Sequence, residues 1–299
     1  MASEAALEQG LEVWLSPEMW DKMPEKTLKY ITKAAVEAEK LNQTYPERLV
    51  FSVGSELTLF MRGIVEGRDF AARIKNPNLI SHLKAGDHNN PLNQFLSKTD
   101  DSVRKEFHGK LTYASLVWEA VDWKLFDFVG VDHYSINRIE DKYVEMLKPA
   151  FTHHKPVVVT EFGYATCQGG LGSEGFLNSS GLGGDIIDLK SQFLHQIPLL
   201  GRFVRPHIKG KHVRDEEWQA RKLVENLEVL EEAGVDGAFV FQFISQITPH
   251  NEDPRFDLDM ASSSLVKYYD DGKHGKTYPD MPWEPKESFR AVADYYAKH

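Results

Sequence analysis

The chain has 299 residues, of which 41% are hydrophobic and 27% are charged, and its formal net charge is −10. This composition is typical of a globular α/β protein, and the negative charge argues against a nucleic-acid or anionic-membrane partner. No apolar run approaches the roughly 18 residues of a membrane span, and the N-terminal residues lack the basic and apolar regions of a signal peptide. Cys167 is the single cysteine, which excludes an internal disulfide, so we expect a cytoplasmic protein.

Six strand-like apolar runs alternate with helix-like segments along the chain. The strands are expected at residues 11–16, 49–56, 111–115, 128–134, 157–161 and 237–243. Helices are expected at residues 25–41, 216–233 and 285–296, with helix and loop over 79–96. The 216–233 helix has Asp215 as a candidate N-cap and Gly234 as the candidate residue after its C-cap. Strands separated by helices predict a parallel sheet with right-handed crossovers.

No linker divides the chain, so we expect one domain over residues 1–299. The segment 169–184 is rich in glycine and follows the fifth expected strand. It could form a lid over a site at the end of that strand, or it could be a plain surface loop.

Two glutamates end strand-like runs, Glu56 after residues 49–55 and Glu161 after residues 156–160. A carboxylate is costly to bury without partners, and the C-terminal strand ends carry the chemistry of parallel α/β barrels. Two such carboxylates are what glycoside hydrolysis needs. The alternative is that each glutamate pairs with an arginine or lysine of the barrel and has a structural role.

The order of these features resembles the clan A glycoside hydrolases, which are retaining (β/α)8 barrels. The run VTEFG at residues 159–163 is similar to their nucleophile strand, the seventh, and VGSE at residues 53–56 is similar to their acid/base strand, the fourth. The resemblance implies Glu161 as nucleophile and Glu56 as acid/base, with a raised pKa and the two carboxyl groups about 5–5.5 Å apart. It also implies that Tyr134 hydrogen-bonds the nucleophile, and His133 is a second candidate donor.

The chain also resembles bacterial proteins labelled as abortive-infection proteins with a glycosidase-like barrel. The stretches that carry this resemblance are residues 55–60, 257–262 and 278–285. That label implies no chemistry.

Two positions depart from the clan A pattern. Ser55 stands where the clan usually has an asparagine that binds the sugar 2-hydroxyl, and a hydroxyl cannot supply both functions of an amide. The last expected strand offers Phe241, Gln242 and Phe243 where the clan commonly presents a tryptophan platform. Both changes argue against an ordinary sugar in the cleaved position.

The six expected strands would correspond to strands three to eight of such a barrel. The expected fold is therefore an α/β barrel of the TIM type that is incomplete, with residues 1–10 as the end of a helix capped by Gly10. An open parallel edge is unfavourable, so we expect a homo-oligomer or a partner chain that covers the missing strands. The alternative is that residues 76–96 contain a further strand.

Several other side chains are candidates for contact with a substrate. Trp14 alternates with apolar neighbours and is a stacking platform or a core tryptophan. Trp20 and Glu119 lie on expected rim loops, where aromatic rings beside carboxylates suit a polyol or a cation, and Gln242 could reach a ligand from the last strand. No metal-ligand spacing and no nucleotide-binding motif is present, so we expect neither a metal nor a cofactor.

The leading hypothesis is a retaining glycoside hydrolase-like enzyme that acts on a carbohydrate or another small molecule. A second hypothesis keeps both glutamates but assigns them a non-hydrolytic isomerisation, elimination or cyclisation of a small, natural-product-like substrate. A third is a non-catalytic barrel relic that serves in binding or assembly.

Overall fold

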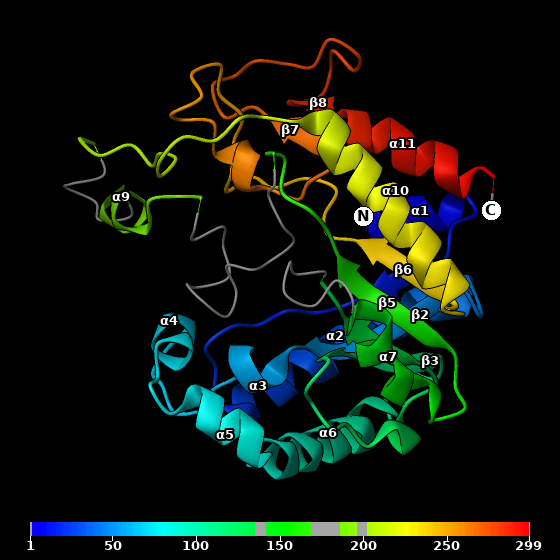
Figure 1. Cartoon of the computed structure of the whole chain (residues 1–299). Coiled ribbons are helices and arrows are strands. Elements are labelled where there is room, and N and C mark those ends of the chain that lie inside the picture. Colours follow the sequence, from blue (N-terminus) through cyan, green and yellow to red (C-terminus); the bar gives the residue numbers. More distant parts are fainter. Residues whose placement is uncertain (1, 135–141, 169–185, 196–201, 299) are drawn as a thin grey trace. The chain divides into compact units, whose positions relative to one another are not determined.

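The computed structural model describes residues 2–134, 142–168, 186–195 and 202–298 (Figure 1). The expected glycine-rich lid over 169–184 lies outside these residues. The chain divides into two compact units. Unit 1 comprises Met1–His133 and Met146–Thr160, and unit 2 comprises Tyr134–Glu145 and Glu161–His299. The expectation of one domain over 1–299 stays a prediction.

The described chain contains a sheet of six strands that follow one another in chain order (Figure 1). They are β1 (Val13–Leu15), β2 (Leu49–Ser55), β3 (Lys110–Leu116), β4 (Val129–Asp132), β5 (Val157–Phe162) and β6 (Gly237–Val240). The pairs β1–β2, β2–β3 and β3–β4 are parallel. The fold is thus α/β, an incomplete barrel of the TIM type, and all six expected strands are present.

Helices connect the strands of unit 1, and β2 is buried along its whole length between them. Its neighbours α2 (Pro24–Thr44) and α6 (Asn89–Val103) pack against β2 and against each other. The shorter helices are α3 (Leu57–Phe60), α4 (Phe70–Ile74) and α5 (Leu79–Ala85). Because α5 and the start of α6 occupy residues 79–96, the alternative of a further strand there is wrong.

The first helix, α1 (Ala2–Glu8), ends as the sequence predicts. Gly10 adopts a left-handed conformation with φ of 88°. The N–H of Leu11 then donates to the carbonyl of Ala6 at 3.1 Å, which closes the helix end.

Unit 2 contains α10 (Glu216–Glu232) packed against α11 (Glu287–Tyr296), together with α9 (Leu189–His195). The carboxylate of Asp215 accepts a hydrogen bond from the N–H of Trp218 at 2.8 Å, and Gly234 has a φ of 81°. Both predicted caps of α10 are therefore confirmed. The antiparallel pair β7 (Val266–Tyr268) and β8 (Trp283–Pro285) was not predicted. Helix α7 (Tyr143–Phe151) begins in the residue range of unit 2 and continues in that of unit 1.

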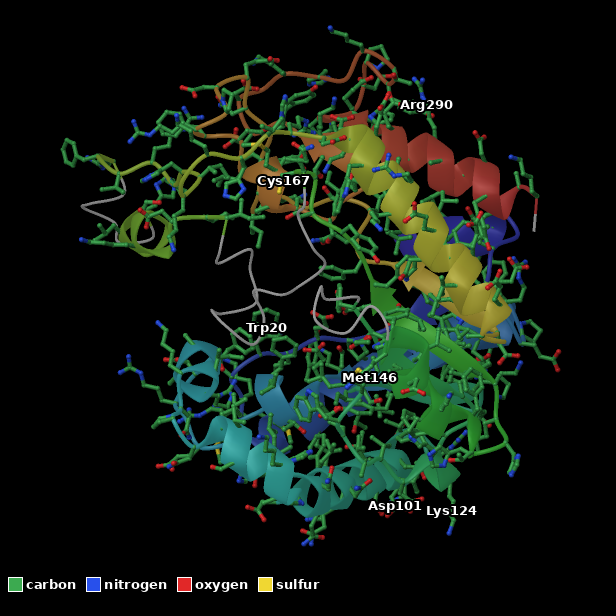
Figure 2. All side chains as sticks on the ribbon, viewed as in Figure 1. Trp20, Asp101, Lys124, Met146, Cys167 and Arg290 are labelled. Carbon is green, nitrogen blue, oxygen red and sulfur yellow. The ribbon has the colours of Figure 1, made fainter. Side chains whose placement is uncertain are left out.

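Cys167 lies in a small apolar cluster of unit 2 and is 1% exposed (Figure 2). Its neighbours in this cluster include Ile187, Ile208 and Met260. Burial raises the pKa of the thiol to about 11, so the folded protein keeps it protonated. In the described part of the chain no helix combines the length and the apolar character needed to cross a membrane.

Candidate functional site

Glu56 sits where β2 turns into α3, and its backbone is fixed on both sides. The residue is 4% exposed and has φ of 45° and ψ of 40°, a left-handed conformation that is uncommon outside glycine. Its N–H donates to the carbonyl of Ala114 on β3 at 2.9 Å. Its carbonyl accepts from the N–H groups of Leu59 at 2.9 Å and Phe60 at 3.0 Å. The strand end is therefore held in one conformation by β3 and α3.

Side chains of β2 and β5 meet at Asp132, which closes β4 and is 2% exposed. The Ser55 hydroxyl donates to Asp132 Oδ2 at 3.0 Å, and the Thr160 hydroxyl donates to Asp132 Oδ1 at 2.6 Å. Ser55 is thus directed to a neighbouring carboxylate. Asp132 was not among the predicted site residues, although it ends a strand in the same way as Glu56.

Glu119 is buried, whereas the sequence predicted it on an exposed rim. It is 7% exposed, and its carboxylate accepts from the N–H groups of Thr58 at 3.2 Å and Leu116 at 3.0 Å. The Tyr113 hydroxyl adds a third hydrogen bond at 3.0 Å. Burial raises the pKa of Glu119 to about 7, against the lowering effect of these hydrogen bonds. This placement supports a structural role in the turn after β2 more than the predicted contact with substrate.

Glu161, in unit 2, lies near the end of β5 and is half-buried. The Tyr134 hydroxyl donates to Glu161 Oε2 at 2.7 Å. The ring of Tyr134 also lies edge-on to Phe241, with 6.5 Å between ring centroids. A short hydrogen bond from a phenol favours the ionised form of a carboxylate. The contact that the resemblance implies between Tyr134 and the proposed nucleophile is therefore present.

The other residues predicted to contact a ligand are His133, Gln242 and Trp14, and each lies in a different environment. His133 is 1% exposed and follows β4. Gln242 is half-buried after β6, and its backbone carbonyl accepts from Leu265 at 2.9 Å. Trp14 is half-buried, tilted against Phe128 with 4.8 Å between centroids, and hydrogen-bonded to a neighbouring acid. These environments are compatible with packing roles.

Trp20 is the most exposed of the predicted aromatic contacts, at 41% (Figure 2). Its ring stacks on Phe60 at 4.3 Å and borders a shallow hollow that is open to solvent. Glu18, Ser55 and Leu57 also line this hollow. Trp20 therefore lies beside the turn that carries Glu56, as a rim platform would.

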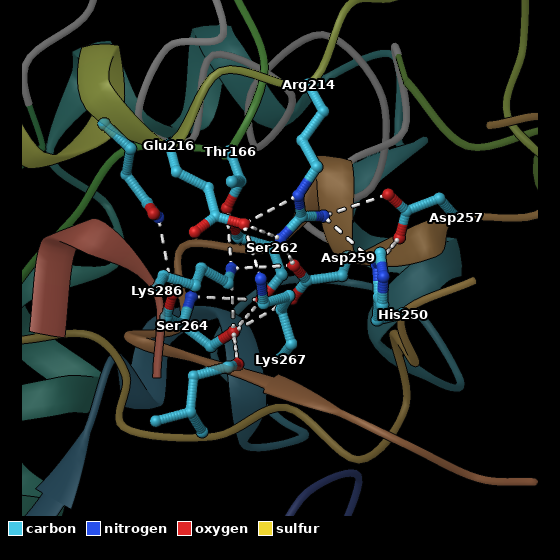
Figure 3. A network of polar contacts seen from close by, with 12 residues as sticks. Thr166, Arg214, Glu216, His250, Asp257, Asp259, Ser262, Ser264, Lys267 and Lys286 are labelled. Atoms are coloured by element: carbon cyan, nitrogen blue, oxygen red, sulfur yellow. Dashed lines mark hydrogen bonds and ion pairs between the residues drawn. The ribbon is translucent and has the colours of Figure 1, made fainter. Parts of the chain in front are cut away.

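Unit 2 also contains a network of buried charges that the sequence did not predict (Figure 3). The guanidinium of Arg214 donates to Asp257 at 2.9 Å and to Asp259 at 2.8 Å. Lys286 is fully buried and pairs with Asp259 at 2.9 Å, and burial lowers the pKa of the Lys286 amine to about 8. Burial alone would raise the pKa of Asp257, but the hydrogen bond from His250 and the charge of Arg214 hold it below its ordinary value.

The same network contains three side chains whose geometry would suit a metal ion. One ligand atom from each of His250, Asp257 and Asp259 lies within 4.8 Å of the others. Both carboxylates already accept from Arg214, and a fixed cation opposes the binding of a second one. The donor set thus fits a metal poorly, and the network holds unit 2 together instead.

Neither a family model nor a curated protein matches the chain. Solved structures do match it. A GH113 β-1,4-mannanase matches with a TM-score of 0.51 at 14% identity, over 92% of this chain and 63% of the mannanase chain. A GH2 β-galacturonidase from Eisenbergiella tayi bound to galacturonate matches with a TM-score of 0.54 at 14% identity, over 99% of this chain and 42% of that chain. The chain spans less than two thirds of either structure, and the likeness shows a glycosidase-like fold.

Proposed function

We propose that the protein is a retaining glycoside hydrolase-like enzyme in which Glu161 is the nucleophile and Glu56 is the acid/base. The observation that carries the proposal is the 2.7 Å hydrogen bond from Tyr134 to Glu161. It orients the carboxylate at a strand end, where barrel enzymes of this type place their chemistry. Glu161 would attack the anomeric carbon, Glu56 would protonate the leaving oxygen, and Glu56 would then activate water.

The position of Glu56 supports its half of the mechanism. A buried carboxyl group favours the neutral acid, and the 4% exposure of Glu56 meets that condition. Its fixed backbone would direct the proton to one place on the substrate. The glycosidase-like fold supports a hydrolase, and the lone cysteine suits a cytoplasmic setting.

A second candidate is the non-hydrolytic acid/base enzyme, and Ser55 favours it. The Ser55 hydroxyl donates to Asp132 at 3.0 Å. A sugar 2-hydroxyl would therefore not find the amide that clan A enzymes usually offer at this position. The same two glutamates could then isomerise, eliminate from or cyclise a small substrate. The third candidate is a non-catalytic barrel relic, which an activity assay can exclude.

A panel of aryl glycosides separates these candidates when it is tested on the wild type and on Glu161→Ala and Glu56→Ala variants, with azide added as an external nucleophile. In a retaining enzyme, azide rescue of Glu161→Ala yields a glycosyl azide of inverted configuration, and rescue of Glu56→Ala yields one of retained configuration. Glu217→Ala is the matched control, because Glu217 is an exposed residue of α10. A wild-type activity that survives Glu161→Ala would overturn the proposal. No turnover on any glycoside, with ligand binding retained, would favour the relic.

A further inference from the structure

Helix α3 begins at Glu56, but the Glu56 side chain does not cap it. Glu56 is the N-cap residue, and no hydrogen bond runs from the α3 N–H groups to its side chain. The first N–H groups of a helix have no partner within the helix, and the N-cap side chain usually supplies one. In this turn other residues take that place.

The two N–H groups that follow Glu56 are bound from β3 and from the loop after it. The N–H of Leu57 donates to the Tyr113 hydroxyl at 2.8 Å, and the N–H of Thr58 donates to Glu119 at 3.2 Å. Tyr113 in turn donates to Glu119, so the two side chains form one connected clamp. Tyr113 is fully buried. The whole Tyr113–Glu119 clamp belongs to unit 1.

The clamp limits the hydrogen bonds that the Glu56 side chain can accept. Hydrogen bonds from N–H groups stabilise a carboxylate over the neutral acid. A glutamate at an N-cap could turn back to accept from the N–H groups of Leu57 and Thr58, and its pKa would then be lower than that of a carboxyl group without these bonds. Because Tyr113 and Glu119 already occupy both donors, Glu56 is denied this arrangement.

We propose that Tyr113 and Glu119 cap α3 in place of Glu56 and thereby keep Glu56 as a proton donor. They are positioning residues, since they contact the turn and not the substrate. The inference rests on the proposed acid/base role of Glu56, but its structural half can be measured without any substrate.

The experiment follows the titration of the Glu56 carboxyl group by carbon NMR, with Glu56→Gln to assign the signal. Tyr113→Phe removes the acceptor of the Leu57 N–H, so Glu56 should turn to cap α3 and titrate about one pKa unit lower, a tenfold change in acid dissociation. Tyr143→Phe is the matched control. Tyr143 is also a buried tyrosine, and its hydroxyl accepts from Asn226 at 3.0 Å in unit 2. The control should leave the Glu56 titration unchanged.

Glu119→Gln provides a second variant if Tyr113→Phe does not fold. It keeps one acceptor oxygen and replaces the other with an amide, so the shift should have the same direction and be smaller. An unchanged Glu56 titration in the folded variants, together with unchanged hydrogen exchange of the Leu57 and Thr58 amides, would overturn the clamp.

Activity separates the clamp from the proposed function. If the wild type hydrolyses a glycoside, Tyr113→Phe should lower kcat at neutral pH with KM unchanged, and it should move the alkaline limb of the pH–rate profile to lower pH. A titration shift in a protein that hydrolyses no glycoside would reject the proposed function and leave the clamp standing. Hydrolysis without a titration shift would reject the clamp alone.

Discussion

The two units hold their buried carboxyl groups in opposite ways. In unit 1, Glu119 accepts hydrogen bonds from two backbone N–H groups and a tyrosine, and no cation of the described residues pairs with it. In unit 2, Asp259 pairs with both Arg214 and Lys286. Burial raises the pKa of Glu119 to about 7 although its neutral donors lower it, whereas the hydrogen bond from His250 and the charge of Arg214 outweigh burial at Asp257 and hold the pKa of that carboxyl below its ordinary value. Nearby cations thus offset the effect of burial at Asp257, and neutral donors do not offset it at Glu119.

The largest effect is expected for Glu161, whose known donor in the structure is a neutral tyrosine. We expect Glu161→Ala to lower any activity by a factor on the order of 10⁴ or more. The fold should survive, because the hydrogen bond that Glu161 accepts from Tyr134 contributes only about 0.5–1.5 kcal/mol. Enzyme assay and thermal unfolding of the same sample provide the check. Unfolding of the variant would place Glu161 with the structural carboxylates of unit 2.

Asp259 tests the buried carboxyl groups of unit 2, which pair with cations. Asp259→Asn removes a negative charge that compensates the positive charges of Arg214 and Lys286. Breaking a buried ion pair in this way should lower the unfolding free energy by about 3–5 kcal/mol. The matched control is Asp271→Asn, which breaks an exposed pair with Lys273 and should cost less than about 1 kcal/mol. Urea unfolding measures both variants. Equal losses would mean that the network contributes no more than a surface pair.

Glu119 gives a smaller effect that depends on pH. Its pKa is about 7 in the folded protein and 4.5 as the reference value, so the folded state binds the proton more tightly. The stability linked to that proton is complete below about pH 4.5 and is lost as the pH rises through about 7. We expect about 1–3 kcal/mol to be lost between pH 5 and 8. Urea unfolding across this pH range should show the loss of unfolding free energy in the wild type and not in Glu119→Gln. If the unfolding free energies of both proteins change with pH in the same way, the predicted role of Glu119 is wrong.

The last prediction concerns association and leaves the interior of both units unchanged. β1 stands at one end of the strand order, and its three residues are only half-buried. An edge strand with apolar side chains is a site for pairing. We propose a homo-oligomer, or a complex with a chain that covers this edge. Light scattering at micromolar concentration decides the matter, and a monodisperse particle at the monomer mass of 34.1 kDa would reject association.

The strands and the caps of α10 could be predicted because each depends on neighbouring residues. Apolar runs indicate strands, and Asp215 with Gly234 marks the two ends of one helix. The hairpin of β7 and β8 could not be predicted in this way, since each strand has three residues and its partner lies far along the chain. The pair of Tyr134 and Glu161 came from a family resemblance, which supplied the spatial relation that local patterns lack.

The burial of Glu119 shows where sequence reasoning fails. Glu119 was predicted to lie on a rim loop because it follows an expected barrel strand. Two of its three donors are backbone N–H groups, of Thr58 and Leu116, and every residue but proline carries such a group. No sequence pattern identifies these particular N–H groups as the partners of Glu119. Asp132 had a visible signal, because it is a carboxylate at a strand end, and its partner Ser55 also ends a strand.

The buried thiol of Cys167 provides an intrinsic reporter of local opening. At neutral pH a thiol with a pKa of about 11 is ionised to only ~10⁻⁴, and only the thiolate reacts with a disulfide reagent. Labelling must therefore wait until the cluster around Cys167 opens, so its rate measures how often that part of unit 2 opens under native conditions. Since no other cysteine competes for the reagent, the unmodified protein reports the local stability of one unit, and substitutions in the other unit can be tested for transmission to it.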